Sequence, residues 1–331
     1  MAGHSRRQSE TRRYRVTSSA DLTPLRIIAF PGAPNLPVFA AIEQGYFAEE
    51  GVAVDLTTTP SSVFQFEKLN AGEFDIAMTA FDNVVAYREG QGAFSIEGDV
   101  DFVALMGATQ IELGLIAAKD IKTIIDLKGR SLALDALATG FAFILYEMLA
   151  KAGLRIEDCP MVPVGATPTR WESVRDGVHA ATLGIEPFTS IARNAGFPII
   201  ASSADVTSSY QGGIVAAKQS WAQANAATVE AYLKGYLRGL AWVLDPANHD
   251  AAASLLSAKM PAIKPQALPA VMKSLLSPAS GLTPDGAILR DGISTVLDLR
   301  SRYGGGDVLS DIDKYLDLSF YERARAALAT S

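Results

Sequence analysis

Hydrophobic and polar positions along this chain repeat one pattern twice. The first copy opens with LRIIAF at residues 25–30, an apolar run closed by Pro and Gly, which is typical of a buried strand. Residues 36–51 then place apolar side chains at helical spacing and end at a glycine. The alternation continues to residue 108, with strands predicted at 25–30, 52–59, 73–80 and 102–108 and helices at 36–51, 62–72 and 83–92.

The second copy covers residues 130–202. It predicts strands at 130–135, 161–165, 179–184 and 197–202 and helices at 141–153, 169–177 and 187–196. Strands that alternate with helices at this spacing indicate parallel sheets joined by right-handed crossovers. Two such copies predict two α/β lobes with a cleft between them, and in such sheets ligands lie beyond the carboxyl ends of the strands.

The strand pattern stops after about residue 218, and the rest of the chain is predicted to be helical. Residues 221–245 have a long helical period, and shorter helices interrupted by prolines follow. The glycines at 304–306 indicate a connector, because no strand precedes them and no Lys-Ser/Thr pair follows.

Composition excludes several classes of protein. With 331 residues, of which 49% are hydrophobic and 20% charged, the chain can build two lobes with substantial cores. The net charge is −7 and the charges are scattered, whereas a nucleic-acid binder shows a basic face. The longest apolar stretch, 136–150, is interrupted by polar residues, so no direct insertion into a membrane is expected.

The first 24 residues are basic and polar, and we expect them to be disordered. They contain no apolar core of signal-peptide length, so either an export signal is missing from the start of this sequence or the protein is cytoplasmic. Cys159 is the only cysteine, which excludes a disulfide within the chain.

Four stretches point to a family. PVFAAIEQGYFAEEGVAVDL at 37–56 resembles the opening of the substrate-binding proteins of ABC transporters, of the nitrate/sulfonate/taurine and thiamine-pyrimidine-precursor type. LNAGEFDIAMT at 69–79, IKTIIDLKGRSLALD at 121–135 and RWESVRDGVHAATLGIEP at 170–187 resemble later parts of that family, in the same order. The resemblance covers roughly residues 25–245 and is more specific for the fold than for the ligand.

This resemblance implies a two-lobe, type II periplasmic-binding-protein fold in which each lobe is a mostly parallel sheet flanked by helices. It implies chain crossings near 106–118 and 203–216, with a basic tail at 1–24, lobe I at 25–106, lobe II at 107–207, and the completion of lobe I with C-terminal helices at 208–331. Two crossings form a hinge that closes on a ligand. The implied partners are a small-molecule ligand and the ABC permease and ATPase subunits. We expect a monomer in an extracytoplasmic location, without a metal or a cofactor.

The candidate ligand-binding residues follow from the resemblance and lie in loops at strand ends. Ser and Thr at helix starts combine a hydroxyl with free backbone N–H groups, which suits an anion, although capping alone also explains Ser61, Ser62, Thr139 and Asp82. Aromatic candidates could stack on a flat ligand or belong to the core. The candidates are Phe30, Pro34, Asn35, Ser61, Ser62, Thr79, Phe81, Asp82, Asn83, Thr139, Gly140, Phe141, Arg170, Glu186 and Tyr210.

The charges in these loops favour a neutral or cationic ligand. Asp82 and Glu186 supply two carboxylates, whereas Arg170 is the only cation and could equally be a solvated residue at the start of a helix. An aromatic or heterocyclic compound with amino groups would suit this balance.

Catalysis has little support in the sequence. No histidine lies beside a candidate nucleophile, and Cys159 has no partner at zinc-ligand spacing. A sulfinate desulfinase on this fold carries a Cys nucleophile in its first loop, but loop 30–36 has none here, and the Cys-rich motif of related pyrimidine synthases is also missing. We therefore predict a solute-binding protein rather than an enzyme. The alternative is a cytoplasmic enzyme or ligand sensor on the same fold, acting on a small aromatic or heterocyclic compound.

Overall fold

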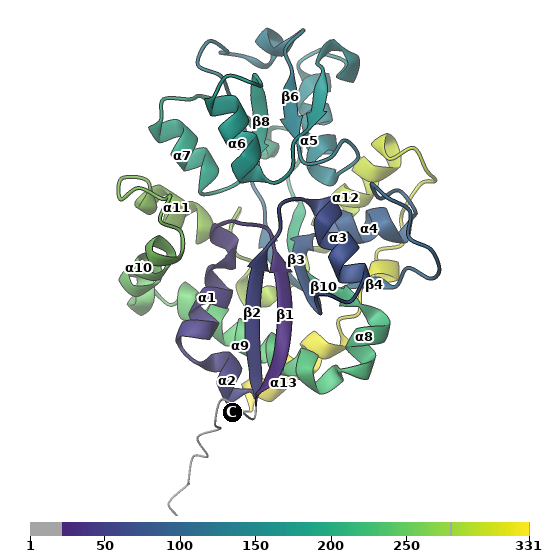
Figure 1. Cartoon of the computed structure of the whole chain (residues 1–331), viewed down its shortest axis with the longest axis vertical. Coiled ribbons are helices and arrows are strands. Elements are labelled where there is room, and N and C mark those ends of the chain that lie inside the picture. The colour runs from purple at the N-terminus through teal and green to yellow at the C-terminus, as the bar shows by residue number, and fades with distance from the viewer. Residues whose placement is uncertain (1–21, 279, 331) are drawn as a thin grey trace, which may run out of the picture.

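A computed structural model describes residues 22–278 and 280–330 as two lobes, each built on a five-stranded sheet (Figure 1). The basic tail predicted over residues 1–24 lies, up to residue 21, outside the described residues. We call the lobe at the bottom of Figure 1 lobe I and the one at the top lobe II.

Lobe I contains a sheet with the strand order β2-β1-β3-β10-β4. Strands β1, β2 and β3 are parallel, whereas β10 runs antiparallel to both of its neighbours. The strand bounds are β1 Thr23–Ala29, β2 Val52–Thr58, β3 Ile76–Ala80, β4 Phe102–Gln110 and β10 Gln211–Lys218.

Lobe II contains the order β7-β6-β8-β5-β9, with β6 parallel to both neighbours and β5 antiparallel to both of its own. Its strands are β5 Gly114–Ala117, β6 Leu132–Leu134, β7 Met161–Pro163, β8 Ala181–Gly184 and β9 Ile199–Ser202. The predicted two-lobe α/β fold is confirmed. Both sheets are mixed, however, and not mostly parallel. The chain crosses between lobes after β4 and after β9, and the strand that follows each crossing, β5 or β10, is antiparallel to its neighbours.

Helices cover both sheets. The helices that follow strands of the two sheets are α1 Leu36–Glu43, α2 Tyr46–Glu49, α3 Ser62–Asn70, α4 Phe81–Arg88, α5 Gly140–Lys151, α6 Thr167–Arg175 and α7 Phe188–Asn194. The C-terminal helices are α8 Gln219–Ala224, α9 Ala226–Leu244, α10 His249–Lys259, α11 Leu268–Leu275, α12 Arg290–Tyr303 and α13 Ser319–Ala329.

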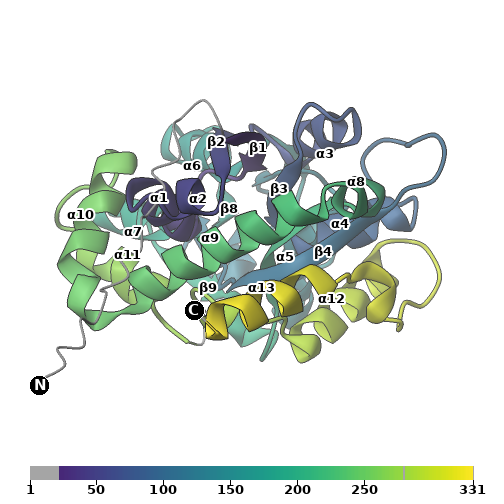
Figure 2. The ribbon, with the colours of Figure 1, turned by 90° about the horizontal axis from the view of Figure 1, so that it is seen from below.

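The long helix α9 anchors the base of lobe I. Figure 2 shows α9 and α13 side by side beneath the first sheet. Phe47 stacks on Tyr232 of α9 with ring centroids 5.3 Å apart. Gly239 permits the close approach of α1, because a Cβ there would lie 2.2 Å from the carbonyl oxygen of Pro37. This packing fixes the helix that follows β1, and with it the loop between them that faces lobe II.

Helix α12 joins the two lobes on one side. It packs against α4 and β10 of lobe I and also against α5 of lobe II. The C-terminal region therefore contacts both lobes.

Candidate functional site

A cavity of about 90 Å³ lies between the lobes. Lobe I contributes the loop after β1, the end of β3 with the start of α4, and the strands β4 and β10 near the crossings. Lobe II contributes the segments after β6 and β8 and the first turns of α5 and α6. The lining residues are Phe30, Gly32, Pro34, Asn35, Met78, Thr79, Ala80, Asn83, Ala108, Thr109, Ile111, Asp135, Thr139, Gly140, Phe141, Thr167, Arg170, Ile185, Gly213 and Ile214.

Arg170 is the cation of this cavity, and it is 2% exposed. One terminal nitrogen donates to Thr182 Oγ1 at 3.1 Å and to the carbonyl oxygen of Leu183 at 2.8 Å, and the other donates to Thr167 Oγ1 at 2.8 Å. Its Nε is buried and has no partner within the described part of the chain. Burial lowers the pKa of Arg170 to about 10, against the opposing effect of the negative charge of Asp135. The alternative of a solvated Arg170 is therefore wrong.

Asp135 is the carboxylate of the cavity, and it connects the lobes. Its two oxygens accept a hydrogen bond from the backbone N–H of Ser62, at 3.1 and 3.3 Å. The N–H of Ala166 donates to the carbonyl oxygen of Pro60 at 2.8 Å, again between lobes. These hydrogen bonds hold the two lobes together beside the cavity.

Most of the cavity wall is apolar, and several polar groups on it already have partners. The Nδ2 group of Asn83 donates to Thr79 Oγ1 at 2.9 Å, and that of Asn35 donates to the carbonyl oxygen of Phe30 at 2.8 Å. Apolar side chains with a few placed polar groups are typical of small-molecule sites.

Nine of the fifteen predicted binding residues line this cavity, and six do not. Their roles in binding stay predictions. The nine are Phe30, Pro34, Asn35, Thr79, Asn83, Thr139, Gly140, Phe141 and Arg170, and the six are Ser61, Ser62, Phe81, Asp82, Glu186 and Tyr210.

Two of the Ser and Thr candidates serve as helix caps. Ser61 accepts from the N–H of Phe64 at 3.1 Å and caps α3. Thr139 accepts from the N–H of Ala142 at 3.4 Å and caps α5, while also lining the cavity. Capping is thus observed at Thr139, and its role in ligand binding stays a prediction.

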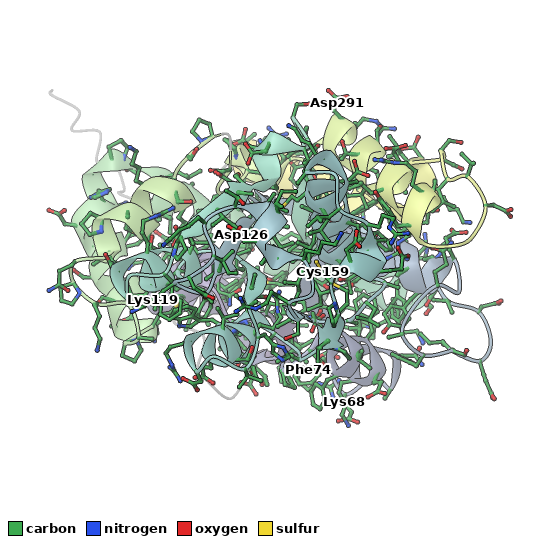
Figure 3. All side chains as sticks on the ribbon, turned by 90° about the horizontal axis from the view of Figure 1, so that it is seen from above. Lys68, Phe74, Lys119, Asp126, Cys159 and Asp291 are labelled. Carbon is green, nitrogen blue, oxygen red and sulfur yellow. The ribbon has the colours of Figure 1, made fainter. Side chains whose placement is uncertain are left out.

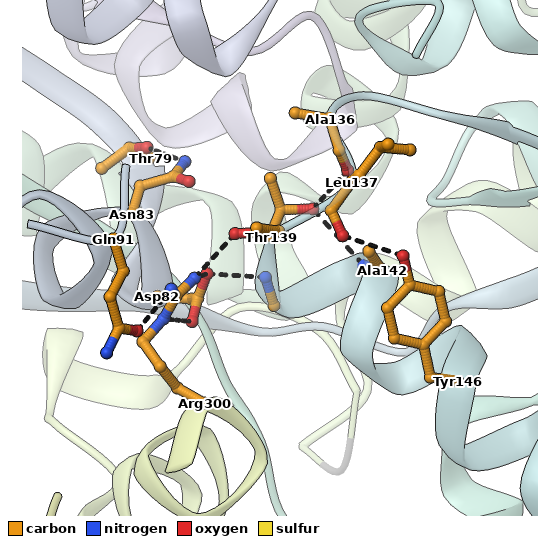
Figure 4. A network of polar contacts seen from close by, with 12 residues as sticks. Thr79, Asp82, Asn83, Gln91, Ala136, Leu137, Thr139, Ala142, Tyr146 and Arg300 are labelled. Atoms are coloured by element: carbon orange, nitrogen blue, oxygen red, sulfur yellow. Dashed lines mark hydrogen bonds and ion pairs between the residues drawn. The ribbon is translucent and has the colours of Figure 1, made fainter. Parts of the chain in front are cut away.

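Asp82 is not the helix cap that the sequence suggested. Helix α4 begins at Phe81, so the capping position is Ala80. The side chain of Asp82 is 1% exposed and accepts two hydrogen bonds from Arg300, at 2.7 and 2.6 Å, as Figure 4 shows. It also accepts from the N–H of Gly140 at 2.6 Å. Its charge is thus neutralised outside the cavity lining.

Glu186 also has a partner within its own segment. Its two carboxylate oxygens accept from Ser190 Oγ at 2.9 Å and from the N–H of Ser190 at 3.3 Å. Neither Asp82 nor Glu186 lines this cavity, although Glu186 lines two neighbouring hollows, so the acidic cleft expected from these two side chains stays a prediction.

The remaining aromatic candidates are core residues. Phe81 is fully buried and packs edge-on against Tyr315, with ring centroids 6.1 Å apart. Tyr210 is 4% exposed, and its hydroxyl group, which has no partner among the described residues, lies near Gly140. Burial, followed by the charge of Asp82, raises the pKa of Tyr210 well above its usual value.

Sequence reasoning missed several lining residues. Asp135 directly follows β6, and Thr167 is the first residue of α6, so their positions near strand ends could have identified them. Asp135 should have been counted among the charges. Ile111 lies in the segment after β4 where the chain crosses between lobes, and Ile214 lies within β10; both are residue types common in protein cores. No pattern distinguished them.

Cys159 lies away from this cavity, within lobe II (Figure 3). It is 2% exposed, and its thiol donates to the carbonyl oxygen of Leu127 at 3.2 Å. Burial, followed by the charge of Asp158, raises the pKa of the Cys159 thiol. A buried thiol with a raised pKa is a weak nucleophile.

A family model described as NMT1/THI5 like matches residues 34–249, which is well over half of the chain. The chain belongs to the NMT1/THI5-like family. This membership, together with the structures below, confirms the resemblance to substrate-binding proteins. No curated protein sequence matches this NMT1/THI5-like chain significantly.

Solved structures share the fold of this NMT1/THI5-like protein at low sequence identity. A Bordetella bronchiseptica protein has a TM-score of 0.77 at 23% identity, covering 93% of this chain and 99% of its own. The nitrate-binding protein NrtA from Synechocystis PCC 6803 has a TM-score of 0.75 at 14% identity, and the match covers 94% of this chain and 90% of NrtA. The periplasmic aliphatic sulphonate binding protein SsuA from Escherichia coli has a TM-score of 0.66 at 18% identity, and the match covers 89% of this chain and 92% of SsuA.

Within 22–278 and 280–330, each helix is too short or too polar to cross a membrane. The same residues contain no group of three or more His, Cys, Asp or Glu side chains placed to hold a metal ion.

Proposed function

We propose that this protein is the solute-binding component of an ABC transporter and captures a small organic molecule between its lobes. The observation that carries the proposal is the buried guanidinium of Arg170 at the wall of the interlobe cavity, with Nε unpaired among the described residues. A buried charge without a carboxylate partner is unfavourable unless another group pairs with it. The hydrogen bonds of Arg170 to described residues all go to neutral oxygens, and Asp135 acts on it only through its charge. A ligand would supply the anionic acceptor that is missing.

The relatives support a binding role. Two of the similar structures are, by their descriptions, a sulphonate-binding and a nitrate-binding periplasmic protein. The partners we propose are a permease and an ATPase, and the proposed location is extracytoplasmic. A monomer is sufficient, because both walls of the cavity come from one chain.

The lining defines the class of ligand. Arg170 favours an anionic head, since charge-assisted hydrogen bonds are the stronger ones. Asp135 favours an N–H or O–H donor on the same molecule, and Phe30 and Phe141 face an apolar body. The cavity of about 90 Å³ is smaller than the roughly 150 Å³ of an engineered cavity that binds benzene. We therefore propose a small organic acid that also carries a donor, in place of the amine-type ligand expected from the sequence.

Entry requires the lobes to move apart. Interlobe hydrogen bonds on Ser62 and Ala166 close the cavity in this structure. Hinge closure around a ligand is the usual motion of periplasmic binding proteins. The two chain crossings, between β4 and β5 and between β9 and β10, are the hinge that we propose.

A thermal-shift screen tests this function. The compounds are small sulfonates, carboxylates, amino acids, amines and pyrimidines. A ligand at a hundred times its Kd stabilises a protein by about 2.7 kcal/mol, which raises Tm by several degrees. We expect acidic compounds to give that shift and to be recovered unchanged. Chemical conversion of the best compound would instead support the enzyme alternative, and a preference for amines would contradict the proposed ligand class.

A further inference from the structure

Asp82 and Arg300 both belong to lobe I, yet each of them also contacts lobe II. Asp82 lies on α4 and Arg300 on α12. The carboxylate accepts from the N–H of Gly140 at 2.6 Å, and a terminal nitrogen of Arg300 donates to the carbonyl oxygen of Ala138 at 3.0 Å. The ion pair thus holds both sides of one short segment of lobe II, residues 138–140 (Figure 4).

That segment forms part of the cavity wall. Thr139 and Gly140 line the cavity, while Asp82 and Arg300 do not. We propose that Asp82 and Arg300 are positioning residues that form an interlobe latch, which holds residues 138–140 in place and keeps the ligand-free protein closed. The proposal does not depend on which ligand the cavity takes.

Burial and geometry make the latch strong. The side chains of Arg300 and Asp82 are 0% and 1% exposed. Arg300 is further held by Gln91 Oε1 at 3.1 Å and lies over the ring of Phe143, 4.9 Å from its centroid. A bidentate pair that is excluded from water has a fixed geometry and little screening. Opening the lobes would remove its two bonds to lobe II together.

Asp82 also occupies a position that suits an anion. Gly140 is the first residue of α5, and free N–H groups at a helix start attract negative charge. Here the protein's own carboxylate takes the N–H of Gly140. The start of α5 is thereby neutralised by the protein itself.

Gly140 is required for the latch to close. A Cβ at this position would lie 2.2 Å from the hydroxyl oxygen of Tyr210 and 2.7 Å from the Cβ of Asp82. Both neighbours are buried side chains that cannot move aside easily. Gly140→Ala therefore obstructs the latch without changing any charge.

The test is the distance between the lobes in the ligand-free protein, measured by pulsed spin-label spectroscopy. Labels are attached at Glu67→Cys on α3 and Glu172→Cys on α6, in a Cys159→Ser background. Both label sites are exposed, one in each lobe. The latch variants are Gly140→Ala and the double variant Asp82→Ala with Arg300→Met, which leaves no unpaired buried charge.

We expect one short distance between the two labels when the latch is unaltered. In both latch variants, most molecules should show a label distance longer by several ångströms. The matched control is Arg302→Met, which removes an exposed ion pair between the same helices, α12 and α5. This control should keep the short distance. A long distance without any latch substitution, or a short distance in the folded Gly140→Ala variant, would overturn the proposal.

Discussion

Asp82 and Arg300 lie 218 positions apart in the sequence and form a bidentate ion pair with N···O distances of 2.7 and 2.6 Å. Asp82 follows the third strand, and Arg300 comes from a C-terminal helix. The pair neutralises a carboxylate that would otherwise make the space between the lobes acidic. It explains why counting charges in the sequence misjudged the cavity.

The first prediction concerns the stability of this pair. Arg300→Met leaves the carboxylate of Asp82 buried and unpaired, which should lower the free energy of unfolding by about 3–5 kcal/mol. Arg302→Met breaks an exposed pair with Glu147 and should change it by less than about 1 kcal/mol. Urea unfolding followed by circular dichroism measures both. The double variant Asp82→Ala with Arg300→Met should regain part of the loss, and equal losses for Arg300→Met and Arg302→Met would count against a strong buried pair.

The second prediction is a pH dependence of stability at Glu89. Burial opposes its ionisation, but hydrogen bonds from Lys314 and Tyr315 outweigh this and lower the pKa of Glu89. A carboxyl group with a lowered pKa in the folded state stabilises the fold above its unfolded pKa, near 4.3, and this stabilisation is lost as the pH falls through the folded value.

Glu89→Gln should therefore be less stable than the wild type at pH 7, and the difference should shrink below about pH 4. Unfolding curves between pH 7 and pH 3 measure this difference. Glu172→Gln, at an exposed carboxylate on α6, serves as the control. A difference for Glu89→Gln that stays constant with pH would show that ionisation of Glu89 does not matter.

The third prediction is that Cys159 has no chemical role. Its thiol is buried, and its pKa is raised. A thiol reagent should modify the folded protein much more slowly than the unfolded protein at the same pH. Cys159→Ser should bind the best compound of the screen with unchanged affinity. Loss of binding in a folded Cys159→Ser variant would reveal a function that this structure does not indicate.

The sequence predicted the fold better than the site. Helical and strand periodicity are local, so eight strands and the order of the two copies followed from them. The strands β5 and β10 were missed because they break the alternation of strands and helices: each follows another strand, β4 or β9, with no α-helix between them. Both pair with strands distant in the sequence, and this pairing makes the sheets mixed.

Site residues could be predicted where their position near the carboxyl end of a strand was sufficient to identify them. Loops at strand ends supplied Phe30, Asn35 and Arg170, which do line the cavity. Side-chain partners across long sequence distances could not be predicted. Asp82 pairs with Arg300, and Glu186 turns toward Ser190, so neither carboxylate faces the cavity.

The charge of the ligand is the subject of the fourth prediction. Compounds that share a propyl chain and differ in the charged head, such as butanoate and propylamine, separate the two signs. The acid should bind at least tenfold more tightly, because Arg170 has a free Nε and Asp82 is neutralised. Asp135→Asn should weaken acids that carry an amino or hydroxyl donor more than acids that do not. Tighter binding of the amine would restore the preference expected from the sequence.

Calorimetric titration of the best compound into Arg170→Met tests the central claim most directly. A charge-assisted hydrogen bond contributes about 1.5–3 kcal/mol, so Kd should rise by roughly 10- to 100-fold. Arg175→Met, at an exposed arginine of the same helix, should leave Kd unchanged. Circular dichroism must show that both variants are folded. An unchanged Kd in folded Arg170→Met would contradict capture of the ligand in this cavity.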